Sequence, residues 1–234
     1  MIDPTPTAVT ATARLAFAAA AVLSLGGNLL SFWIGWHKDS DLDAGAGYSH
    51  VFAHGWENLL NQPTYFTFLS NFLVGITSLL LALRLHRPST LVRVLRLTGV
   101  ACIVITGVVF NLLLRDGPSA TPLEGFHDTV QHIVTPILTP LLWAVVGPRR
   151  QVTWRVVGLS TVVPLAWLAF TLVRGPWLDW YPYTILDVPR LGYGGVLVYV
   201  VAILGFFVAV AALLRGADAA LARAGVGVGA DRRR

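Results

Sequence analysis

The sequence predicts an all-α integral membrane bundle of about six transmembrane helices. Hydrophobic residues make up 55% of its 234 positions and charged residues only 12%, whereas a soluble domain carries roughly 25% charged residues. A helix rises about 1.5 Å per residue, so it needs about 20 mostly apolar residues to cross a hydrocarbon layer about 30 Å thick. Six stretches meet or nearly meet that length: residues 14–35, 64–85, 94–114, 129–146, 152–173 and 192–214.

The first and fourth stretches are the least regular of the six. Arg14 is the only basic residue of the N-terminal segment, which has no clear cleavage site, so we interpret the first stretch as a spanning helix. The fourth contains Pro136 and Pro140, which predict a kink whose freed carbonyls find other partners inside the protein. No long polar segment separates the stretches. Residues 1–224 are therefore a single predicted domain, and the tail at 225–234, rich in Gly and Arg, is predicted to be disordered.

The distribution of Lys and Arg predicts the orientation, because short cytoplasmic loops carry the excess of basic residues. The loops after the second and fourth stretches and the C-terminal segment contain Arg84, Arg87, Arg93, Arg96, Arg149, Arg150, Arg155, Arg215, Arg223 and Arg232 to Arg234. The opposite loops are mostly acidic, so both termini are predicted to be cytoplasmic. Amphipathic rings prefer the membrane boundary. The predicted outer boundary has a cluster of such residues: Trp33, Trp36, Trp177, Trp180, Tyr181 and Tyr183.

Four polar side chains share one depth in the outer halves of three predicted helices. Thr67 and Asn71 lie about one and two turns into the second stretch, and Asn111 lies about one turn from the outer end of the third. His132 lies about one turn into the fourth. Residues four apart share a helix face, so Thr67 lies beside Asn71 and His132 beside Asp128. Polar groups inside a membrane are costly and mark candidate functional sites.

These residue types are the parts of a nucleophilic ester hydrolase. In such a site a base removes a hydroxyl proton and a carboxylate orients the base. Thr67, His132 and Asp128 are therefore the candidate catalytic residues, and Asn71 or Asn111 would donate to the oxyanion.

Structural interpretations of the same residues remain open. A threonine in a membrane helix often donates to a backbone carbonyl three or four residues back. Asp128 and Gln131 fit a capping box at the start of the fourth helix, which does not prevent Asp128 from orienting His132. An intramembrane histidine is often only a hydrogen-bonding residue. Asn71 and Asn111 can link neighbouring helices.

Other chemistries have little support. His50 and His54 have helical ligand spacing but lack an HExxH motif, so no metal site is predicted. A haem bundle needs histidines on two facing helices, and only His132 lies well inside a predicted span. The single cysteine, Cys102, excludes an intramolecular disulfide. The chain has no GxSxG, P-loop or GxGxxG motif and no nucleic-acid-binding motif, so neither a cofactor nor a nucleic-acid partner is predicted.

Five parts of the chain share the pattern of a known family. They are Tyr-Phe-Thr-Phe-Leu-Ser-Asn at 65–71, Thr-Gly-Val-Val-Phe-Asn-Leu-Leu-Leu-Arg at 106–115, His132 with Pro136 and Trp143, Phe-Thr-Leu-Val-Arg-Gly at 170–175, and the segment 180–187, which begins Trp-Tyr-Pro-Tyr. Over about residues 64–214 the chain resembles the androgen-induced protein family, especially its bacterial branch. The resemblance implies a bacterial inner (plasma) membrane.

Animal members of that family are multi-span membrane hydrolases of fatty acid esters of hydroxy fatty acids, with an essential threonine and histidine. The resemblance implies these roles for Thr67 and His132. It also implies a substrate or oxyanion site that includes Asn71 and Asn111 together with Arg115, Tyr181 and Asp187.

The chain departs from the family pattern at four positions. Asp128 replaces an Asn four residues before the histidine, and an ionised Asp would stabilise the protonated imidazole. Thr184 and Ile185 replace an expected Pro and Phe, and Leu142 replaces an Asp of bacterial relatives. The last three changes affect details of the substrate site rather than the Thr–His pair.

The sequence therefore predicts a membrane-embedded hydrolase of lipid esters. Its substrate would enter laterally from the outer leaflet, and an apolar cavity between helices would hold the acyl chain. The lipid ester and membrane lipids are the predicted partners, and the oligomeric state is not predicted. The alternative is a non-enzymatic lipid-binding or transport bundle in which the polar residues only hold helices together. A cavity that joins Thr67 to His132 favours the hydrolase.

Overall fold

The computed structural model describes residues 6–43, 45–84, 89–115, 117 and 119–227, and these contain helices and loops but no strand. The helical elements in chain order are α1 (Pro6–His37), α2 (Trp56–Asn61), η1 (Gln62–Thr64), α3 (Phe66–Leu83), α4 (Thr90–Val109), η2 (Phe110–Leu114), α5 (Pro122–Thr129), η3 (Val130–Val134), α6 (Thr135–Val146), α7 (Trp154–Ser160), α8 (Val162–Leu178), η4 (Thr184–Leu186) and α9 (Val188–Arg223). Arg87, the predicted end of the second span at residue 85, and the tail from residue 228 lie outside the described residues.

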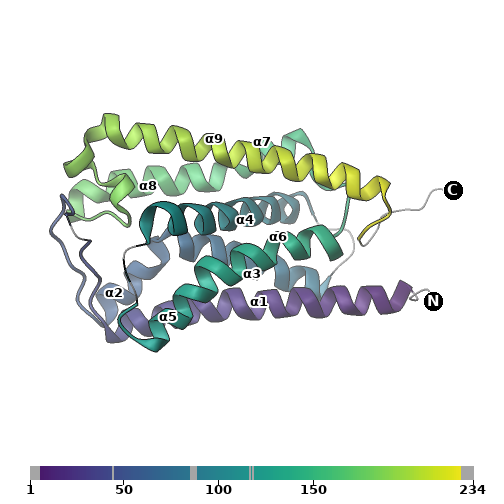
Figure 1. Ribbon diagram of the computed structural model, residues 1–234, viewed down its shortest axis with the longest axis horizontal. Coiled ribbons are helices and arrows are strands. Elements are labelled where there is room, and N and C mark those ends of the chain that lie inside the picture. Colours follow the sequence, from purple (N-terminus) through teal and green to yellow (C-terminus); the bar gives the residue numbers. More distant parts are fainter. Residues whose placement is uncertain (1–5, 44, 85–88, 116, 118, 228–234) are drawn as a thin grey trace.

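Six helical segments among these residues are long and apolar enough to cross a membrane. They are Thr10–His37, Phe66–Leu83, Thr90–Leu114, Pro122–Val146, Trp154–Leu178 and Val188–Arg223. They confirm the predicted all-α bundle. Figure 1 shows α2, α5 and their connecting loops at one end, which we call the outer end after the predicted orientation. α1 begins and α9 ends at the opposite end, as an even number of spans requires.

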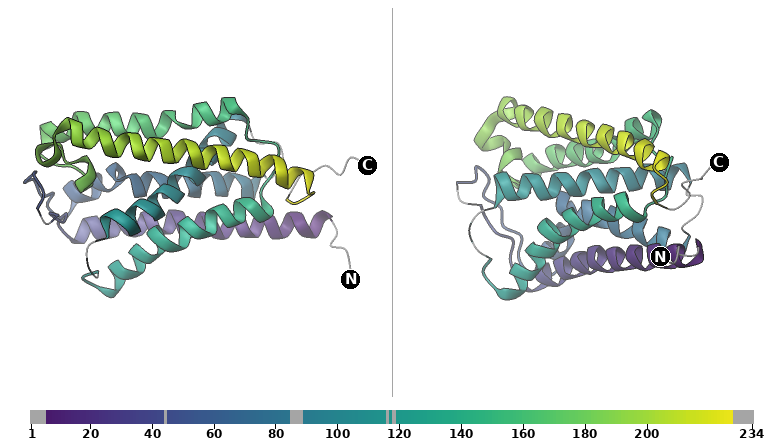
Figure 2. Two further views of the ribbon diagram at one scale, coloured as in Figure 1. Left: turned by 45° about the horizontal axis from the view of Figure 1, so that its top comes forward. Right: turned by 45° about the vertical axis from the view of Figure 1, so that its right-hand side comes forward.

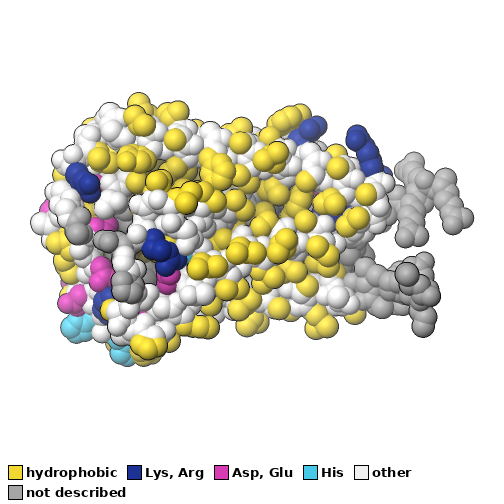
Figure 3. Space-filling view, in the orientation of Figure 1, with side chains coloured by type: hydrophobic (Ala, Val, Ile, Leu, Met, Phe, Trp, Pro, Cys, Tyr) yellow, Lys and Arg dark blue, Asp and Glu magenta, His cyan; other side chains and the backbone are white. Residues whose placement is uncertain are grey.

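The surface of the bundle is apolar along its length and charged at its ends. Figure 3 shows hydrophobic side chains over the middle of the molecule, with charged side chains toward its two ends. Leu15, Leu112 and Leu213 are 72%, 77% and 73% exposed. An apolar surface of this extent suits lipid tails rather than water. The chain is therefore an integral, multi-pass membrane protein.

α3 is the most buried and α9 the least buried of the six described spans. The most apolar part of α3 is 56% buried, against 17% for α9. α3 packs against α1 and α4, and α9 also packs on α4. Both views in Figure 2 place α8 and α9 on the side away from α1. A Cβ atom at Gly75 would lie 2.6 Å from the side chain of Leu25, so glycine lets α3 approach α1 closely.

The fourth span begins earlier than predicted. α5 starts at Pro122, and Thr121 and Glu124 form a reciprocal capping box there. The predicted capping box of Asp128 and Gln131 is therefore wrong, because both residues lie inside the helical segment. The apolar pattern starts late because the first turns of this helix carry polar residues at the outer end of the bundle.

Two π-helical turns lie in the outer parts of the spans: η2 ends the third span at Leu114, and η3 lies between α5 and α6 in the fourth. Such turns insert one extra residue into the helical ladder and occur often at functional sites. Pro136 follows η3 and has no N–H to offer the carbonyl of His132. That carbonyl accepts from Asn111 Nδ2 at 2.8 Å instead. The freed carbonyl thus finds a partner on another helix, as predicted.

Arg96 lies inside α4 rather than in the predicted cytoplasmic loop. Its side chain is buried and donates to the carbonyl of Pro148 at 3.3 Å. Arg149 donates to the carbonyls of Trp143 and Ala144. The two guanidinium groups thus meet the C-terminal end of α6, where the helix dipole favours cations.

Only part of the predicted aromatic cluster lies at the membrane boundary. Trp33, Trp36 and Trp177 are exposed, whereas Trp180 and Tyr181 are buried. The buried pair belongs to an apolar cluster with Tyr48 and residues of α9. This cluster fixes the segment between α8 and α9 against the loop between α1 and α2, which we call the first outer loop.

Candidate active site

Thr67 lies in the first turn of α3, and its hydroxyl is directed toward another helix. Thr77 and Thr98, deeper in their helices, donate to carbonyls four residues back. The residue four before Thr67 precedes α3, so no helical carbonyl is aligned for its hydroxyl. Thr67 Oγ1 lies 3.2 Å from His132 Nε2 instead. The two side chains expected at one depth therefore meet.

His132 is held through both ring nitrogens and one ring face. Its Nδ1 lies 2.8 Å from Asp128 Oδ1. A carboxylate can only accept, so Nδ1 carries the hydrogen and Nε2 is the acceptor for the hydroxyl of Thr67. The ring of Phe110 stacks on the imidazole at a centroid distance of 3.5 Å and an angle of 9°. The imidazole is therefore held in one orientation, with Nε2 facing the hydroxyl of Thr67.

Asp128 connects the histidine to a cation. Its second oxygen accepts from Arg115 Nη1 at 3.0 Å. Arg115 also donates to Asn111 Oδ1 through Nε and Nη2, at 3.1 and 2.8 Å, and its guanidinium lies over the ring of Phe110. Arg115, expected at the substrate site, is thus bound to Asp128 and Asn111.

Asn71 and Asn111 were expected to donate to an oxyanion, but their amide N–H groups already donate to other acceptors in the protein. Asn71 Nδ2 donates to the carbonyl of Thr67 at 3.0 Å and to Gln131 Oε1 at 3.2 Å. Asn111 Nδ2 donates to the carbonyls of Gly107 and His132 at 2.7 and 2.8 Å. An amide nitrogen has two hydrogens, so neither asparagine has a free donor. Both link helices, which was the structural interpretation of these residues.

Asp187 and Tyr181 have structural contacts. Asp187 is fully buried and accepts from the backbone N–H of Gly47 at 2.6 Å and of Arg190 at 3.0 Å. It therefore caps α9 and fixes the first outer loop, and a direct substrate contact, as expected from the resemblance, does not fit this burial. Tyr181 packs so closely on Gly175 that a Cβ there would lie 2.2 Å from its ring. The family pattern marked these positions without indicating their partners.

Tyr183 is the site residue that the sequence did not identify. Its hydroxyl oxygen accepts from the backbone N–H of Thr67 at 3.2 Å and lies 3.4 Å from Thr67 Oγ1. Burial raises the pKa of Tyr183 above its ordinary value of 10.0, although hydrogen bonds with Thr67 and Phe66 act in the opposite direction. The sequence placed Tyr183 among the interfacial rings and in the family pattern at 180–187, but neither observation indicated contact with Thr67.

A second histidine, His127, lies beside this site. Its Nε2 lies 2.8 Å from Ser31 Oγ and 2.8 Å from Gln131 Nε2, and Gln131 connects onward to Asn71. The expectation that only His132 lies inside a span was therefore wrong, because the fourth span starts at Pro122. Both histidines belong to one helical segment, so they do not provide the facing pair that haem requires.

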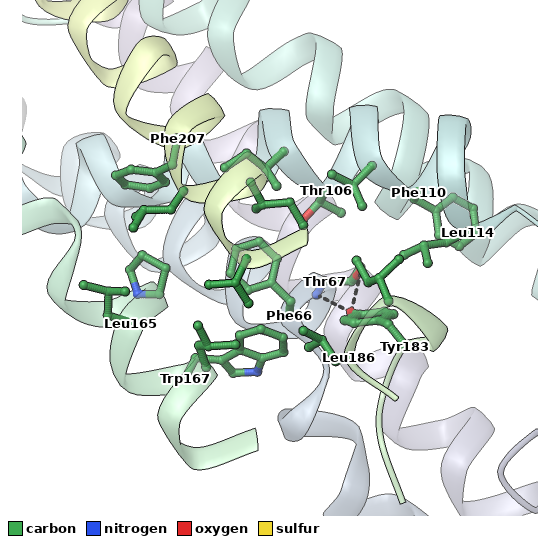
Figure 4. Close-up of a pocket in the computed structure, with 18 residues that line it drawn as sticks. Phe66, Thr67, Thr106, Phe110, Leu114, Leu165, Trp167, Tyr183, Leu186 and Phe207 are labelled. Carbon is green, nitrogen blue, oxygen red and sulfur yellow. Dashed lines mark hydrogen bonds between the residues drawn. The ribbon is translucent and has the colours of Figure 1, made fainter. Parts of the chain in front are cut away.

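Thr67 lies where two cavities of different polarity meet. The first is an apolar cavity of about 100 Å³ between α3, α4, α8 and α9, with Trp167 and Phe207 in its wall (Figure 4). The second, which we call the vestibule, has a volume of about 920 Å³ and lies beneath the outer loops. The vestibule includes His132 and Asp128 in its lining. Four residues line both spaces: Thr67, Phe110, Leu114 and Tyr183.

The histidines of the first outer loop are engaged in other contacts. His54 Nδ1 lies 2.7 Å from Asp39, and His50 packs edge-to-face on Phe52. Among the described residues, no group of three His, Cys, Asp or Glu side chains is arranged to hold a metal ion.

A hydroxyl, an imidazole and a carboxylate in hydrogen-bonded sequence are the parts required for acyl transfer through a covalent intermediate. The site also has an apolar cavity on one side and a polar vestibule on the other. No protein-family model matches the chain, and neither a curated protein nor a solved structure matches it significantly.

Proposed function

We propose that the chain is a membrane-embedded hydrolase of lipid esters, with Thr67 as nucleophile, His132 as base and Asp128 as the carboxylate that orients the base. One observation carries this proposal. Thr67 Oγ1, His132 and Asp128 form a continuous hydrogen-bonded line, with distances of 3.2 and 2.8 Å, where the apolar cavity meets the vestibule. The resemblance to the androgen-induced protein family supports the same roles for Thr67 and His132.

In the acylation step, Thr67 Oγ1 attacks the carbonyl carbon of the ester while His132 Nε2 takes the hydroxyl proton. The carbonyl electron pair moves onto oxygen, and its return expels the alcohol, which takes the proton from His132. Water then attacks the acyl-threonine while His132 takes its proton, the bond between the acyl carbon and Thr67 Oγ1 breaks, His132 returns the proton to Oγ1, and the carboxylic acid is released. Asp128 stabilises the imidazolium in both steps, and Arg115 holds Asp128 in place.

The two cavities suit the two parts of a lipid ester. At about 100 Å³ the apolar cavity has room for the part of an acyl chain next to the ester, and the vestibule, at about 920 Å³, has room for the more polar alcohol part. We infer a fatty acid ester of a hydroxy fatty acid or a similar lipid, which reaches the site laterally from the outer leaflet of a bacterial inner membrane. The site lies at the outer end of the bundle, which matches the depth of an ester group just below the lipid headgroups.

The proposal is tested by ester hydrolysis with purified protein in lipid nanodiscs. Thr67→Ala and His132→Ala should each lower kcat by about 1,000-fold or more. A fluorophosphonate probe, which reacts with activated hydroxyls, should label the wild type and spare Thr67→Ala. Thr77→Ala is the matched control, because Thr77 lies on the same helix and its hydroxyl bonds the carbonyl of Leu73.

Two results would contradict the hydrolase. Hydrolysis at the wild-type rate by His132→Ala would leave His132 as a packing residue. A wild-type protein that neither hydrolyses esters nor reacts with the probe, but retains lipid through purification, would favour the non-enzymatic lipid-binding bundle. The apolar cavity would then be its functional site.

A further inference from the structure

The hydrogen atoms around Thr67 can be assigned from the chemistry of its neighbours. His132 Nδ1 donates to Asp128, so Nε2 accepts the hydroxyl proton of Thr67. The backbone N–H of Thr67 lies in the first turn of α3, has no acceptor within its helix, and donates to the oxygen of Tyr183. The phenolic hydrogen of Tyr183 is therefore directed away from that N–H. Among the described residues, its hydrogen-bond acceptor is Thr67 Oγ1, at 3.4 Å.

We propose that Tyr183 is a catalytic residue that donates its phenolic hydrogen to the oxyanion formed when Thr67 attacks an ester. This inference rests on the proposed function and assigns a role that the two asparagines cannot fill. The amide hydrogens of Asn71 and Asn111 are already bonded to other acceptors.

The position of Tyr183 fits the geometry of the intermediate. After attack, the oxyanion and Thr67 Oγ1 are bonded to the same carbon, so a donor beside one oxygen is also beside the other. Oxyanion donors act at about 2.7–3.1 Å from that oxygen. Tyr183 lines both the apolar cavity and the vestibule, and Figure 4 shows its hydroxyl directed at Thr67. A substrate that extends across the junction places its carbonyl between these two residues.

The surroundings keep the phenol in the form that donates. Burial raises the pKa of Tyr183, so the hydroxyl stays protonated at neutral pH and into the alkaline range. The N–H of Thr67 polarises the phenol further, because a hydroxyl that accepts a hydrogen bond becomes a stronger donor. The N-terminal end of α3 adds partial positive charge where negative charge develops.

The role can be followed through one turnover. In the free protein the phenol donates to Thr67 Oγ1. When Oγ1 bonds the carbonyl carbon and loses its proton to His132, the carbonyl pair becomes the oxyanion, and the phenolic hydrogen bonds that oxygen. The proton stays on Tyr183 throughout. Collapse of the intermediate restores the first hydrogen bond, and the same exchange accompanies attack by water.

The first experiment removes only the hydroxyl. Tyr183→Phe should lower kcat by about 100- to 1,000-fold, the usual loss for one oxyanion donor, with little change in KM. Tyr199→Phe is the matched control, since Tyr199 lies on α9 in the same outer apolar cluster. This control should hydrolyse the ester at the wild-type rate.

The second experiment keeps the hydroxyl but makes it more acidic. Replacement of Tyr183 by 3,5-difluorotyrosine should preserve the fold and support hydrolysis at neutral pH. As the pH rises through the titration of the fluorinated phenol, activity should fall, because a phenolate cannot donate. The wild type should keep its activity over that range. If the hydroxyl had only a structural role, the profile of activity against pH would not show this additional fall at alkaline pH, the alkaline limb.

The outcomes separate the two proposals. An active wild type whose kcat is unchanged by Tyr183→Phe, or a fluorinated protein without an alkaline limb, would overturn the role of Tyr183 and leave the proposed function standing. An inactive wild type would overturn both.

Discussion

Asp128 accepts from His132 with one carboxylate oxygen and from Arg115 with the other, so an ion pair lies directly behind the imidazole. The family pattern that was used to propose the function has Asn at that position. An amide oxygen can orient the ring, but only a carboxylate also stabilises the imidazolium by charge. The arginine that accompanies Asp128 balances its charge in a partly buried place.

Hydrolysis should decline as the pH is lowered, because only a neutral imidazole accepts the proton of Thr67. Asp128→Asn removes the charge that stabilises the imidazolium, so this variant should keep its activity to lower pH than the wild type. Profiles of kcat against pH for both proteins measure the difference. Asp179→Asn, in the outer loop between α8 and α9, is the control. Superimposable acid limbs for wild type and Asp128→Asn would contradict a charged Asp128 in the mechanism.

The meeting of Thr67, His132 and Asp128 could be predicted because the signals are local in the sequence. Asp128 and His132 are four apart, and the depth of Thr67 follows from its place in an apolar run. Tyr183 could not be predicted, since it meets Thr67 across 116 positions from a segment between two spans. Hydropathy gives the depth of a helix but not the direction in which a connecting segment folds.

At the level of the elements, the π turn η3 and the close contact of α4 with α6 place His132. A Cβ atom at Gly107 would lie 2.6 Å from Pro136 Cβ, so glycine allows this contact. The apolar pattern predicted the six helices but neither π turn. Hydropathy indicates which residues lie in lipid. A π turn instead depends on one extra residue within the row of helical backbone hydrogen bonds, and on which donors the freed carbonyls find.

Gly107→Ala should displace η3 from α4 and affect catalysis more than folding. Overpacking of this kind costs about 1–3 kcal/mol of stability, and a shift of about 1 Å in a catalytic group can reduce the rate by about 100-fold. Thermal unfolding and kcat are measured on the same preparation. Gly205→Ala on α9 is the control, because its new methyl group meets no atom within 4 Å. A Gly107→Ala protein with wild-type kcat would show that the contact does not position His132.

On the scale of the whole molecule, the six apolar spans and the single helical bundle followed directly from composition and length. The direction in which the bundle crosses the membrane rests on the arginine distribution. The described arginines of α7 and the end of α9 lie at the end opposite the candidate active site, as that orientation requires.

Single cysteines provide a test of this orientation. Cysteines introduced at Ser49 and Ser119 should react with an impermeant thiol reagent in intact cells, and one at Ser89 should react only after the membrane is opened. The unmodified chain is the control, because its own Cys102 is fully buried. Labelling of the Ser89 variant in intact cells would reverse the topology and place the site on the cytoplasmic side.

The position of Thr67 at the junction of the vestibule and the apolar cavity also bears on what happens after the bond is cut. An ester that extends across this junction is divided into two products on different sides of the nucleophile. For the proposed substrate the alcohol is a hydroxy fatty acid, which is released into the vestibule, while the fatty acid remains among hydrocarbon and returns to the bilayer. Neither product has to pass the other on its way out. If the proposed function holds, we therefore expect the fatty acid to inhibit hydrolysis, because it competes with the acyl part of the substrate for the apolar cavity.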